Sequence, residues 1–443
     1  MNKLNNQKTK IALLGLGLEN QSLLSLLDKN KAPVEITICD RRAQKYLPVH
    51  KAKHLKISYR LEEKFNRDLE DFDLLFRSPG WPINCPGIQA ALKAEQTKLS
   101  SPLNLFFELC PSHNIIGVTG TKGKGTTASL IYDILKANSR QTGRQVFLGG
   151  NIGIAPLSFL NKIKPQDYVV LEMSSFQLED LSISPRIAVI TNLFKEHLAP
   201  ADPNNPNYHS SLSAYWQAKL NIARSKENKF LVINENLKKQ IEKTLNAHNR
   251  KIIFFQESDL ASKLVGTYNR QNIAAAVAVA NILKIKTTVY ETVIKRFGNL
   301  EHRLELVKEE NNIKFFDNSF STTPESTVLD LNSFSGQIIQ IAGGADKGAN
   351  FKPLAKTIKT KTSELILLPG QGSDNLKKEL TKINFPSNKL HLAKDMEKAV
   401  ELAKRFARPG ATVLLSAGCA SFGIFKNYKE RGDLFQKYVR QTK

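Results

Sequence analysis

The chain has 443 residues, a length that domain-size statistics divide into about two to four domains. Hydrophobic residues make up 41% of the chain and charged residues 24%, without a long low-complexity tract, which predicts a globular protein and excludes a disordered one. The formal net charge of +23 suggests a nucleic-acid partner, but the basic residues are dispersed and form no dense block interleaved with aromatic residues. We therefore expect no nucleic acid and a small polyanionic substrate instead.

The cysteines and the N-terminus indicate the cellular compartment of the protein. The four cysteines form no C-x-x-C pair, which argues against a disulfide framework and a zinc site and fits a reducing compartment. The first residues, MNKLNNQKTK, lead straight into an expected strand, and no apolar run approaches the length of a membrane span. We expect a cytoplasmic protein with no membrane insertion, and a monomer by default.

The first expected unit extends to about residue 102. Its strands are KIALLGLG (10–17), VEITICD (34–40) and DFDLLFRSPG (71–80). Gly15 and Gly17 close the first strand, Asn20 stands where a dinucleotide fingerprint has its third glycine, and Asp40 closes the second strand at the spacing of a ribose-binding acid. This pattern is weak for NAD and better for another nucleotide or a nucleotide-sugar; a tight strand–helix turn is the alternative.

The second unit begins with the strand NIIGVTG and the glycine-rich run TKGKGTT. The common phosphate loop has Ser or Thr after its lysine to bind Mg²⁺, but here Gly125 follows Lys124. The strand before this run and the helical spacing of apolar residues after it give the context that a phosphate loop needs. Backbone N–H groups at a helix N-terminus bind anions, and Lys124 can neutralise phosphates. We therefore predict a nucleotide-phosphate site, with an incidental glycine-rich turn as the alternative.

Two candidate metal ligands follow later strands of this unit. Glu172 ends the strand DYVVLEM, and His197 follows the strand RIAVITN. A carboxylate beside triphosphate oxygens suits Mg²⁺. Taken singly, each residue is more often structural; together, beside a phosphate loop, they predict a metal site.

A third unit begins near residue 300. Its expected strands are IKFFDNS, IIQIAGG, ELILLPG and TVLLSAG, and each ends in small or turn residues. Strands alternate with helical stretches throughout the chain, which predicts the α/β class with parallel sheets covered by helices on both faces. Ligands are expected at the carboxyl ends of the strands.

The motifs taken together resemble one family. They are TGTKGKGTT, GGNIG (149–153), LEMSSFQLE (171–179), NLFKEH (192–197), AYWQAKLNIA (214–223), YNRQN (268–272), EHRLE (301–305), AGGADKGANF (342–351) and LLSAGCASFGIFKNYKERG (414–432). In this order, over essentially the whole chain, they resemble the Mur ligases, the ATP-dependent enzymes that form amide bonds in peptidoglycan precursor synthesis. SSFQLE and CASFGIFKNYKERG are typical of the members that add D-glutamate.

The resemblance implies three domains. These are a Rossmann-like UDP-substrate domain at 1–102, a central P-loop ATPase-like domain with a parallel sheet at 103–299, and a Rossmann-like amino-acid-binding domain at 300–443. It implies ATP-dependent addition of D-glutamate to UDP-N-acetylmuramoyl-L-alanine through an acyl phosphate. Because a carboxylate is a poor electrophile until it carries a good leaving group, the protein's part is positioning and charge stabilisation.

Catalytic and cofactor residues follow from matching positions. The catalytic residues implied are Lys124, Glu172, His197 and Lys219. Glu172 and His197 would hold magnesium, with two ions expected and Thr126 as the nearest hydroxyl to replace the one missing at Gly125. Lys219 matches a lysine that CO₂ converts to a carbamate beside the second metal, although on its own it would be interpreted as a solvated helix lysine. ATP contacts are expected from Gly120, Thr121, Lys122, Gly123, Lys124, Gly125, Thr126, Asn269, His302, Arg303 and Asp317.

Substrate contacts follow in the same way. The UDP-linked substrate is expected to contact Gly15, Gly17, Asp40, Arg41, Ser78, Gly80, Asn151, Ser174 and Gln177. D-glutamate is expected to contact Thr322, Lys347, Ser421 and Tyr428. A dianionic amino acid needs cationic or donor groups at both ends, which this set supplies.

The chain departs from the family pattern in two places. The third-domain loop often reads N-D-S-K-A-T, whereas here it reads DNSFST (317–322), so the acid has moved to Asp317 and Phe320 replaces a lysine. Gly125 replaces the usual Ser or Thr, as in the related folylpolyglutamate synthases. These departures leave the ATP contacts of both loops open.

Three alternatives to a D-glutamate-adding ligase remain. A folylpolyglutamate synthase shares the G-K-G run, but that family normally starts near its phosphate loop, whereas over a hundred residues precede it here. A P-loop nucleic-acid ATPase is favoured only by net charge. A catalytically dead regulatory relative is compatible with Gly125 and Phe320, but Lys124, Glu172, His197 and Lys219 argue against it.

Overall fold

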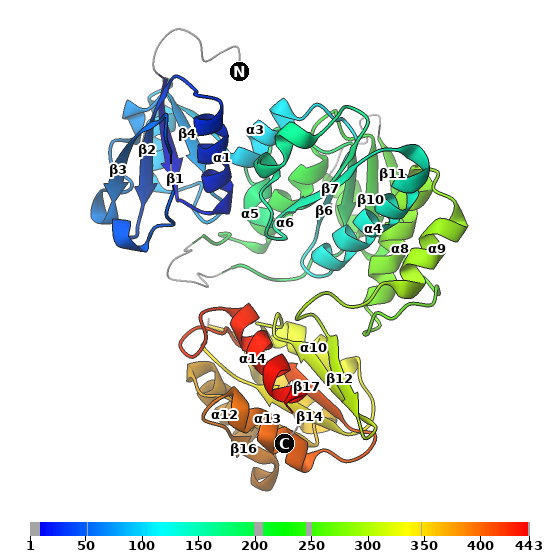
Figure 1. Cartoon of the computed structure of the whole chain (residues 1–443). Helices are drawn as coiled ribbons and strands as arrows, with labels where there is room; N and C mark the ends of the chain where they lie inside the picture. Colours follow the sequence, from blue (N-terminus) through cyan, green and yellow to red (C-terminus); the bar gives the residue numbers. More distant parts are fainter. Residues whose placement is uncertain (1–8, 51, 199–206, 245–249, 347, 442–443) are drawn as a thin grey trace. The chain divides into compact units, whose positions relative to one another are not determined.

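The computed structural model describes residues 9–50, 52–198, 207–244, 250–346 and 348–441, with the backbone alone at 242–244. The chain divides into two compact units, Met1–Leu260 with Gln271–Ile294 and Ala261–Arg270 with Lys295–Lys443. Within the described ranges the first unit holds two sheets and the second holds one (Figure 1). The predicted α/β class with parallel sheets is confirmed. The domain boundaries at 102/103 and 299/300 stay predictions.

The first sheet has the strand order β3-β2-β1-β4-β5, and all its pairs are parallel. Its elements are β1 (Thr9–Leu14), α1 (Leu18–Lys29), β2 (Val34–Asp40), β3 (Lys56–Leu61), β4 (Leu74–Arg77), α2 (Pro86–Lys93) and β5 (Lys98–Ser100), with short 3₁₀ turns at Gln44–Tyr46, Glu62–Lys64 and Leu69–Asp71. Strand order reverses between β1 and β4, so the turns after these two strands flank a crevice at their carboxyl ends.

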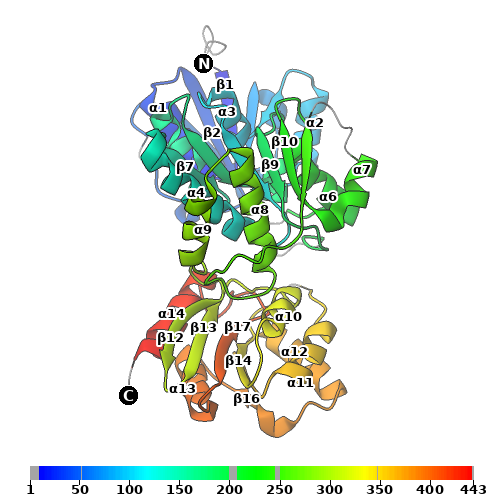
Figure 2. The ribbon, with the colours of Figure 1, turned by 90° about the vertical axis from the view of Figure 1, so that its right-hand side faces the viewer.

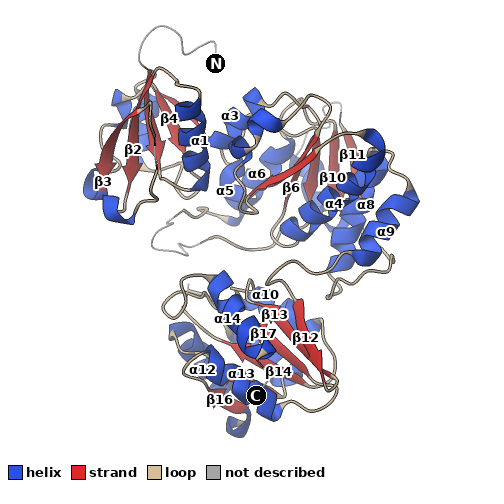
Figure 3. Cartoon of the chain, in the orientation of Figure 1, coloured by secondary structure: helices blue, strands red, loops and turns tan. Residues whose placement is uncertain are grey.

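The second sheet has the order β11-β10-β9-β6-β8-β7, again all parallel. Its strands are β6 (Ile115–Thr119), β7 (Val146–Gly150), β8 (Tyr168–Glu172), β9 (Ile187–Ile190), β10 (Phe230–Asn234) and β11 (Lys251–Phe255). Its helices are α3 (Pro102–Leu109), α4 (Lys124–Thr142), α5 (Ser175–Leu178), α6 (Leu212–Leu220), α7 (Lys238–Thr244), α8 (Asn269–Ile282) and α9 (Thr287–Arg296), with 3₁₀ turns at Pro156–Ser158, Leu160–Lys162, Asn221–Ala223 and Glu235–Leu237. Helices flank the strands on both sides, and α4 lies beside α8 (Figures 2 and 3).

One apolar cluster joins the two sheets of the first unit. It contains Leu23 of α1, Phe106 of α3, Leu160, and Ile190 of β9, all buried. Because the helix-covered face of the first sheet and the core around the second sheet share this cluster, the two sheets form one unit. A crevice at the end of the first sheet can therefore include residues of the second.

The second unit contains the sheet β12-β13-β17-β14-β15-β16, in which only β12 is antiparallel to its neighbour. Its elements are β12 (Glu305–Glu310), β13 (Ile313–Asn318), α10 (Pro324–Asn332), β14 (Ile338–Ala342), α11 (Lys352–Lys361), β15 (Glu364–Leu367), α12 (Gln371–Lys382), a 3₁₀ turn Ser387–Lys389, β16 (Leu390–Leu392), α13 (Met396–Phe406), β17 (Thr412–Ser416) and α14 (Tyr428–Arg440). Val400 of α13 and Phe435 of α14 belong to the apolar cluster on one face, and Leu354 of α11 and Leu376 of α12 to the cluster on the other.

Candidate active site

The glycine-rich run forms a tight turn between β6 and α4. Gly120 has a φ of +144°, and a Cβ there would lie 1.9 Å from the hydroxyl of Thr191. Gly123 has a φ of +81°, and a Cβ there would lie 2.1 Å from Oδ1 of Asn272 on α8. Both positions therefore need glycine for backbone conformation and for space. The turn leads into the 19-residue helix α4, whose first N–H groups are suited to an anion.

Hydrogen bonds to the segment after β9 fix the backbone of this glycine-rich loop. The N–H of Thr121 donates to the carbonyl of Asn192 (2.9 Å), and the N–H of Lys122 donates to the Asn192 side chain (2.8 Å). The Thr121 hydroxyl accepts from the N–H of Phe194 (2.9 Å) and lies 2.9 Å from the hydroxyl of Tyr215. The loop is thereby held in shape before any ligand binds.

Three lysines converge on the loop. Nζ of Lys124 donates to the carbonyl of Thr121 (3.0 Å), and Nζ of Lys122 donates to Oε1 of Glu196 (2.9 Å). Lys219 of α6 is only 2% exposed, and its Nζ donates to the carbonyl of Gly120 (2.8 Å). Burial, followed by repulsion from Lys124, holds the pKa of Lys219 well below its ordinary value. Lys219 is therefore not a solvated helix lysine, and its amine is neutral far more readily than that of a surface lysine.

Glu172 and His197 lie at the ends of β8 and of the segment after β9. Glu172 is 2% exposed; its Oε1 accepts from Nδ2 of Asn151 (2.8 Å), and its buried Oε2 has no hydrogen-bond partner within the described ranges. His197 has a φ of +59°, and partial burial, with nearby lysines, lowers its pKa to about 4. A buried carboxylate oxygen without a partner and a neutral imidazole fit a divalent cation.

In the described parts of the chain, His, Cys, Asp and Glu side chains do not by themselves complete such a site around Glu172 and His197. Among the described residues, the groups of three or more His, Asp and Glu ligand atoms within 4.8 Å of one another both include His302 in the second unit. Around Glu172 and His197, further ligands would have to come from phosphate oxygens, water or other side chains. Thr126, which follows Gly125 on α4, is 8% exposed.

A cavity of about 780 Å³ lies at the switch point of the first sheet. Of the residues predicted to bind the UDP-linked substrate, it is lined by Gly15, Gly17, Asp40, Arg41, Ser78, Gly80, Asn151 and Gln177. Ser174 is not in its lining but caps α5, accepting from the N–H of Gln177 (3.2 Å). Sequence reasoning missed other lining residues, among them Glu19, Arg42, Phe65 and Trp81.

Asp40 is prepared as a charged acceptor at the rim of this cavity. Its carboxylate accepts from the N–H of Leu16 (2.9 Å) and from Nη2 of Arg42 (2.8 Å). Although burial acts in the opposite direction, these bonds lower the pKa of Asp40 below its ordinary value.

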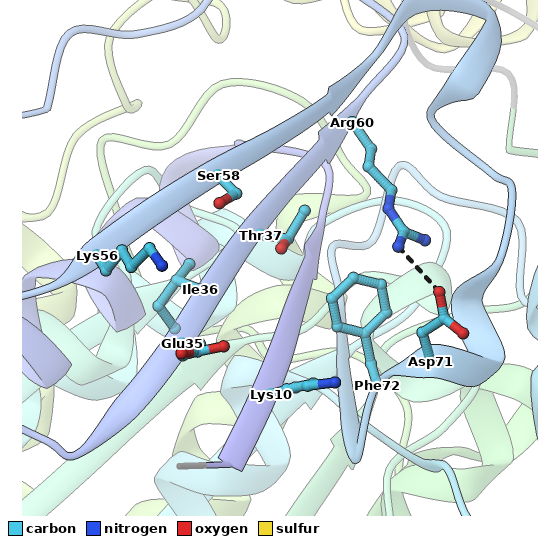
Figure 4. Close-up of a pocket in the computed structure, with 9 residues that line it drawn as sticks. All are labelled: Lys10, Glu35, Ile36, Thr37, Lys56, Ser58, Arg60, Asp71 and Phe72. Carbon is cyan, nitrogen blue, oxygen red and sulfur yellow. Dashed lines mark hydrogen bonds and ion pairs between the residues drawn. The ribbon is translucent and has the colours of Figure 1, made fainter.

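A second hollow, of about 470 Å³, lies on the polar part of the first sheet and contains no predicted site residue (Figure 4). Lys10, Glu35 and Lys56 are cross-strand neighbours along its floor, and Arg60 pairs with Asp71 at 3.0 Å beside it. Alternating charges of this kind are typical of a solvated sheet face.

The predicted residues of the second unit gather at the carboxyl ends of β13 and β17. Nδ1 of His302 lies 2.7 Å from Oδ2 of Asp317. The Arg303 guanidinium lies over the Phe320 ring, 3.7 Å from its centroid, and that ring meets Tyr428 edge-on at 5.1 Å. The residue that replaces the family lysine therefore packs against a predicted ATP contact.

The remaining predictions in this unit have varied outcomes. Thr322 is half-buried and Ser421 is buried. Asn269 donates to the carbonyl of Val265 (2.6 Å) at the start of α8. Lys347 lies outside the described residues.

A buried arginine that sequence reasoning missed supports this region. Arg431 is 0% exposed and donates to the carbonyls of Ser319 (2.7 Å) and Cys419 (3.1 Å), joining the segments after β13 and β17. Burial lowers its pKa to about 10. Arg431 lies in the motif around Tyr428, but only long-range contacts reveal its role. The same is true of Tyr215, Asn272 and Glu196 in the first unit.

Comparisons with known proteins agree with these features. Residues 118–263 match the Mur ligase middle domain, and residues 302–419 match the Mur ligase glutamate ligase domain. The chain is 36% identical to the UDP-N-acetylmuramoylalanine–D-glutamate ligase of Acetivibrio thermocellus, over 99% of this chain and 98% of that protein.

Two solved structures share the fold. The UDP-N-acetylmuramate–alanine ligase of Thermotoga maritima gives a TM-score of 0.55 at 15% identity, covering 99% of this chain and 100% of that one. The bifunctional folylpolyglutamate synthase/dihydrofolate synthase of Yersinia pestis, complexed with AMPPNP and Mn, gives 0.54 at 14% identity, covering 76% and 92%. Every helix within the described ranges is too short or too polar to cross a bilayer. Because the similarity to such a ligase extends over nearly the full length and two Mur ligase domain models match, the chain belongs to the Mur ligase family, among the UDP-N-acetylmuramoylalanine–D-glutamate ligases.

Proposed function

We propose that this protein adds D-glutamate to UDP-N-acetylmuramoyl-L-alanine at the expense of ATP. One observation carries the proposal: Asn151 lines the 780 Å³ cavity and also donates to Glu172 beside the phosphate loop. A cavity sized for a nucleotide-linked substrate thus leads directly to a site suited to a triphosphate and its metal. The acceptor carboxylate and the γ-phosphate would meet there.

The reaction has two steps. An oxygen of the alanyl carboxylate attacks the γ-phosphorus of ATP, and the bond from that phosphorus to the bridging oxygen breaks to release ADP. The amine of D-glutamate then attacks the acyl carbon, loses a proton, and displaces inorganic phosphate with the electron pair of the C–O bond. Neither step needs a covalent bond to the protein, so charge and position decide the rate.

The residues around the phosphate loop divide this work. Lys124 and the N-terminus of α4 would hold the phosphates, and Lys122, oriented by Glu196, would add a second ammonium group. Glu172 and His197 would hold Mg²⁺, which when bound neutralises charge on the triphosphate oxygens. Glu172 has an unpartnered buried oxygen for this purpose.

Lys219 is proposed to act as a carbamate. A neutral amine attacks CO₂ and loses a proton, so the cation becomes an anion. The buried amine beside Gly120 is suited to this step because its lowered pKa leaves a lone pair available. We expect Lys219→Ala to be inactive and partly rescued by acetate, with Lys239→Ala, on the exposed side of α7, as an unaffected control. An active Lys219→Ala variant would remove the carbamate from the mechanism.

Thr322, Lys347, Ser421 and Tyr428 are proposed to bind D-glutamate. Phosphate release from ATP and Mg²⁺ is to be measured with UDP-N-acetylmuramoyl-L-alanine and a panel of amino acids. We expect turnover with D-glutamate and not with L-glutamate. Activity only with L-glutamate and a folate would overturn the proposal. We further propose a cytoplasmic monomer, which sedimentation and cell fractionation will test.

A further inference from the structure

Glu19 is a titratable residue of the substrate cavity to which no role has been assigned. It lies in the first turn of α1, lines the 780 Å³ cavity, and accepts a hydrogen bond at Oε1 from Nε2 of Gln177. Gln177 is fixed on its other side as well, because its Oε1 accepts from the N–H of Ser174 (2.7 Å). Glu19 is therefore the residue that holds the carboxamide of a proposed substrate contact.

The surroundings of Glu19 contain more carboxyl groups than cations. Arg77 of β4 is 1% exposed and donates to Oδ2 of Asp180 (2.9 Å) and to Oε2 of Glu179 (3.0 Å). Three carboxyl groups, those of Glu19, Glu179 and Asp180, thus interact with one buried guanidinium. If all three were ionised, the cluster would hold two uncompensated negative charges out of water, which is strongly unfavourable.

The position of Glu19 favours a proton on this residue. Its Oε2 is buried and has no hydrogen-bond partner among the described residues, so an ionised carboxylate there would lack a donor. Burial, with repulsion from Asp180, outweighs the bond from Gln177 and raises the pKa of Glu19 to about 7. Asp40, Arg41 and Arg42 line the same cavity and complete its charged groups.

We propose that Glu19 is a positioning residue for the UDP-linked substrate, that it acts through the carboxamide of Gln177, and that the cavity binds this substrate when Glu19 is protonated. The inference rests on the proposed function, because it takes the ligand to be a sugar-linked nucleoside diphosphate that ends in a carboxylate. Such a ligand is repelled by an ionised carboxylate in the same cavity. A proton on Glu19 removes that repulsion and leaves Oε1 as the acceptor for Gln177.

Calorimetric titration of UDP-N-acetylmuramoyl-L-alanine into the full-length protein, without ATP or D-glutamate, tests this. For a group titrating at about 7, the wild-type Kd should rise roughly tenfold between about pH 6.5 and 8.5, with about 25-fold as the ceiling. Glu19→Gln keeps an acceptor and cannot ionise, so its Kd should change less than about twofold over the same range. Glu19→Ala, which lacks the acceptor for Gln177, should bind more weakly than Glu19→Gln at both pH values.

Glu179→Gln is the matched control. Glu179 interacts with the same arginine, and burial raises its pKa to about 7 as well, but it does not line the cavity. Its Gln variant should keep the wild-type rise of Kd with pH. A wild-type rise that persists in Glu19→Gln would overturn the inference, and so would one that disappears in Glu179→Gln.

Two further readouts separate this role from a general loss of structure. Carboxyl ¹³C NMR of glutamate-labelled protein should show a group titrating near 7 that is absent in Glu19→Gln. The KM for ATP should not follow the pH dependence of the Kd. A wild type that binds the substrate with a flat pH profile overturns only the role of Glu19, whereas a wild type that binds none at either pH overturns the proposed function too.

Discussion

Replacing Lys219 by methionine tests the buried amine beside the phosphate loop. Methionine keeps an unbranched apolar stem of similar length, and it removes the Nζ that donates to the carbonyl of Gly120. Since losing one positioned electrostatic group costs about a hundredfold or more in rate, we expect ligase activity to fall by at least that factor. Folding should survive, because one lost buried hydrogen bond costs about 1–3 kcal/mol and the cost of burying the amine disappears.

The lowered pKa of Lys219 also predicts how the free energy of unfolding changes with pH, and this magnitude is better defined than the loss of activity. Lys219 is 2% exposed, and burial, with repulsion from Lys124, holds its pKa well below the ordinary value of about 10.4. Between the lowered folded-state pKa and about 10.4, the unfolded chain binds a proton that the folded chain does not. Wild-type stability should therefore rise with pH, by about 1.4 kcal/mol per pH unit inside this window, relative to the methionine variant.

Urea unfolding at several pH values in CO₂-free buffer measures this difference. Trp81 and Trp216 are the two tryptophans, so a Trp81→Phe background makes Trp216, three residues before Lys219 on α6, the reporter of the central sheet. Lys239→Met, at an exposed position, should run parallel to wild type at every pH. A difference between wild type and Lys219→Met that stays flat from about pH 7 to 10 would refute the neutral-amine argument.

Other predictions follow from single contacts. Arg77→Met should lower the free energy of unfolding of the first unit by about 3–5 kcal/mol in urea titrations, because it leaves buried carboxylates unpaired. Thr126→Ala should raise the Mg²⁺ concentration for half-maximal activity about fivefold if this hydroxyl contributes one ligand, and an unchanged Mg²⁺ dependence would exclude it. Although burial opposes it, the bond to Asp317 raises the pKa of His302. The stability that protonated His302 contributes to the second unit is therefore complete below about pH 6.5 and is lost as pH rises through the raised pKa. The melting temperature of the second unit should therefore fall as pH rises over this interval in wild type and not in Asp317→Asn.

Local patterns predicted the parts of the fold that short segments determine. Apolar runs ending in glycine or an acid identified β1, β2, β6 and β8, the run RIAVITN identified β9, and Glu172 was placed at a strand end from the apolar run DYVVLEM. Strands with mixed polar sequences, such as β3 (KISYRL) and β12 (ELVKEE), were missed because partial exposure removes the continuous apolar run.

Contacts between residues far apart in the sequence could not be predicted from local sequence patterns. Sequence spacing could not show that Asn272 of α8 packs on Gly123, or that Arg77 of the first sheet meets Glu179 after β8. Sequence spacing also left the role of Phe320 open. In the structure its ring packs against the guanidinium of Arg303. In each case the partners lie on different elements, so tertiary packing alone determines the contact.

The charges around the phosphate loop explain how a loop without a hydroxyl after its lysine can still serve a triphosphate. The ammonium groups of Lys122 and Lys124 both interact with the carboxylate of Glu196. The carboxylate of Glu172 interacts with Lys219, which adds no positive charge once its buried amine is neutral. The protein therefore contributes almost no net charge where ATP would bring about four negative charges. Divalent ions must compensate the triphosphate, and the carbamate proposed for Lys219 would strengthen that demand by adding another negative charge. Because most of the attraction for the metal then comes from the phosphates and the buried carboxylate, the hydroxyl missing at Gly125 removes only one neutral ligand among several.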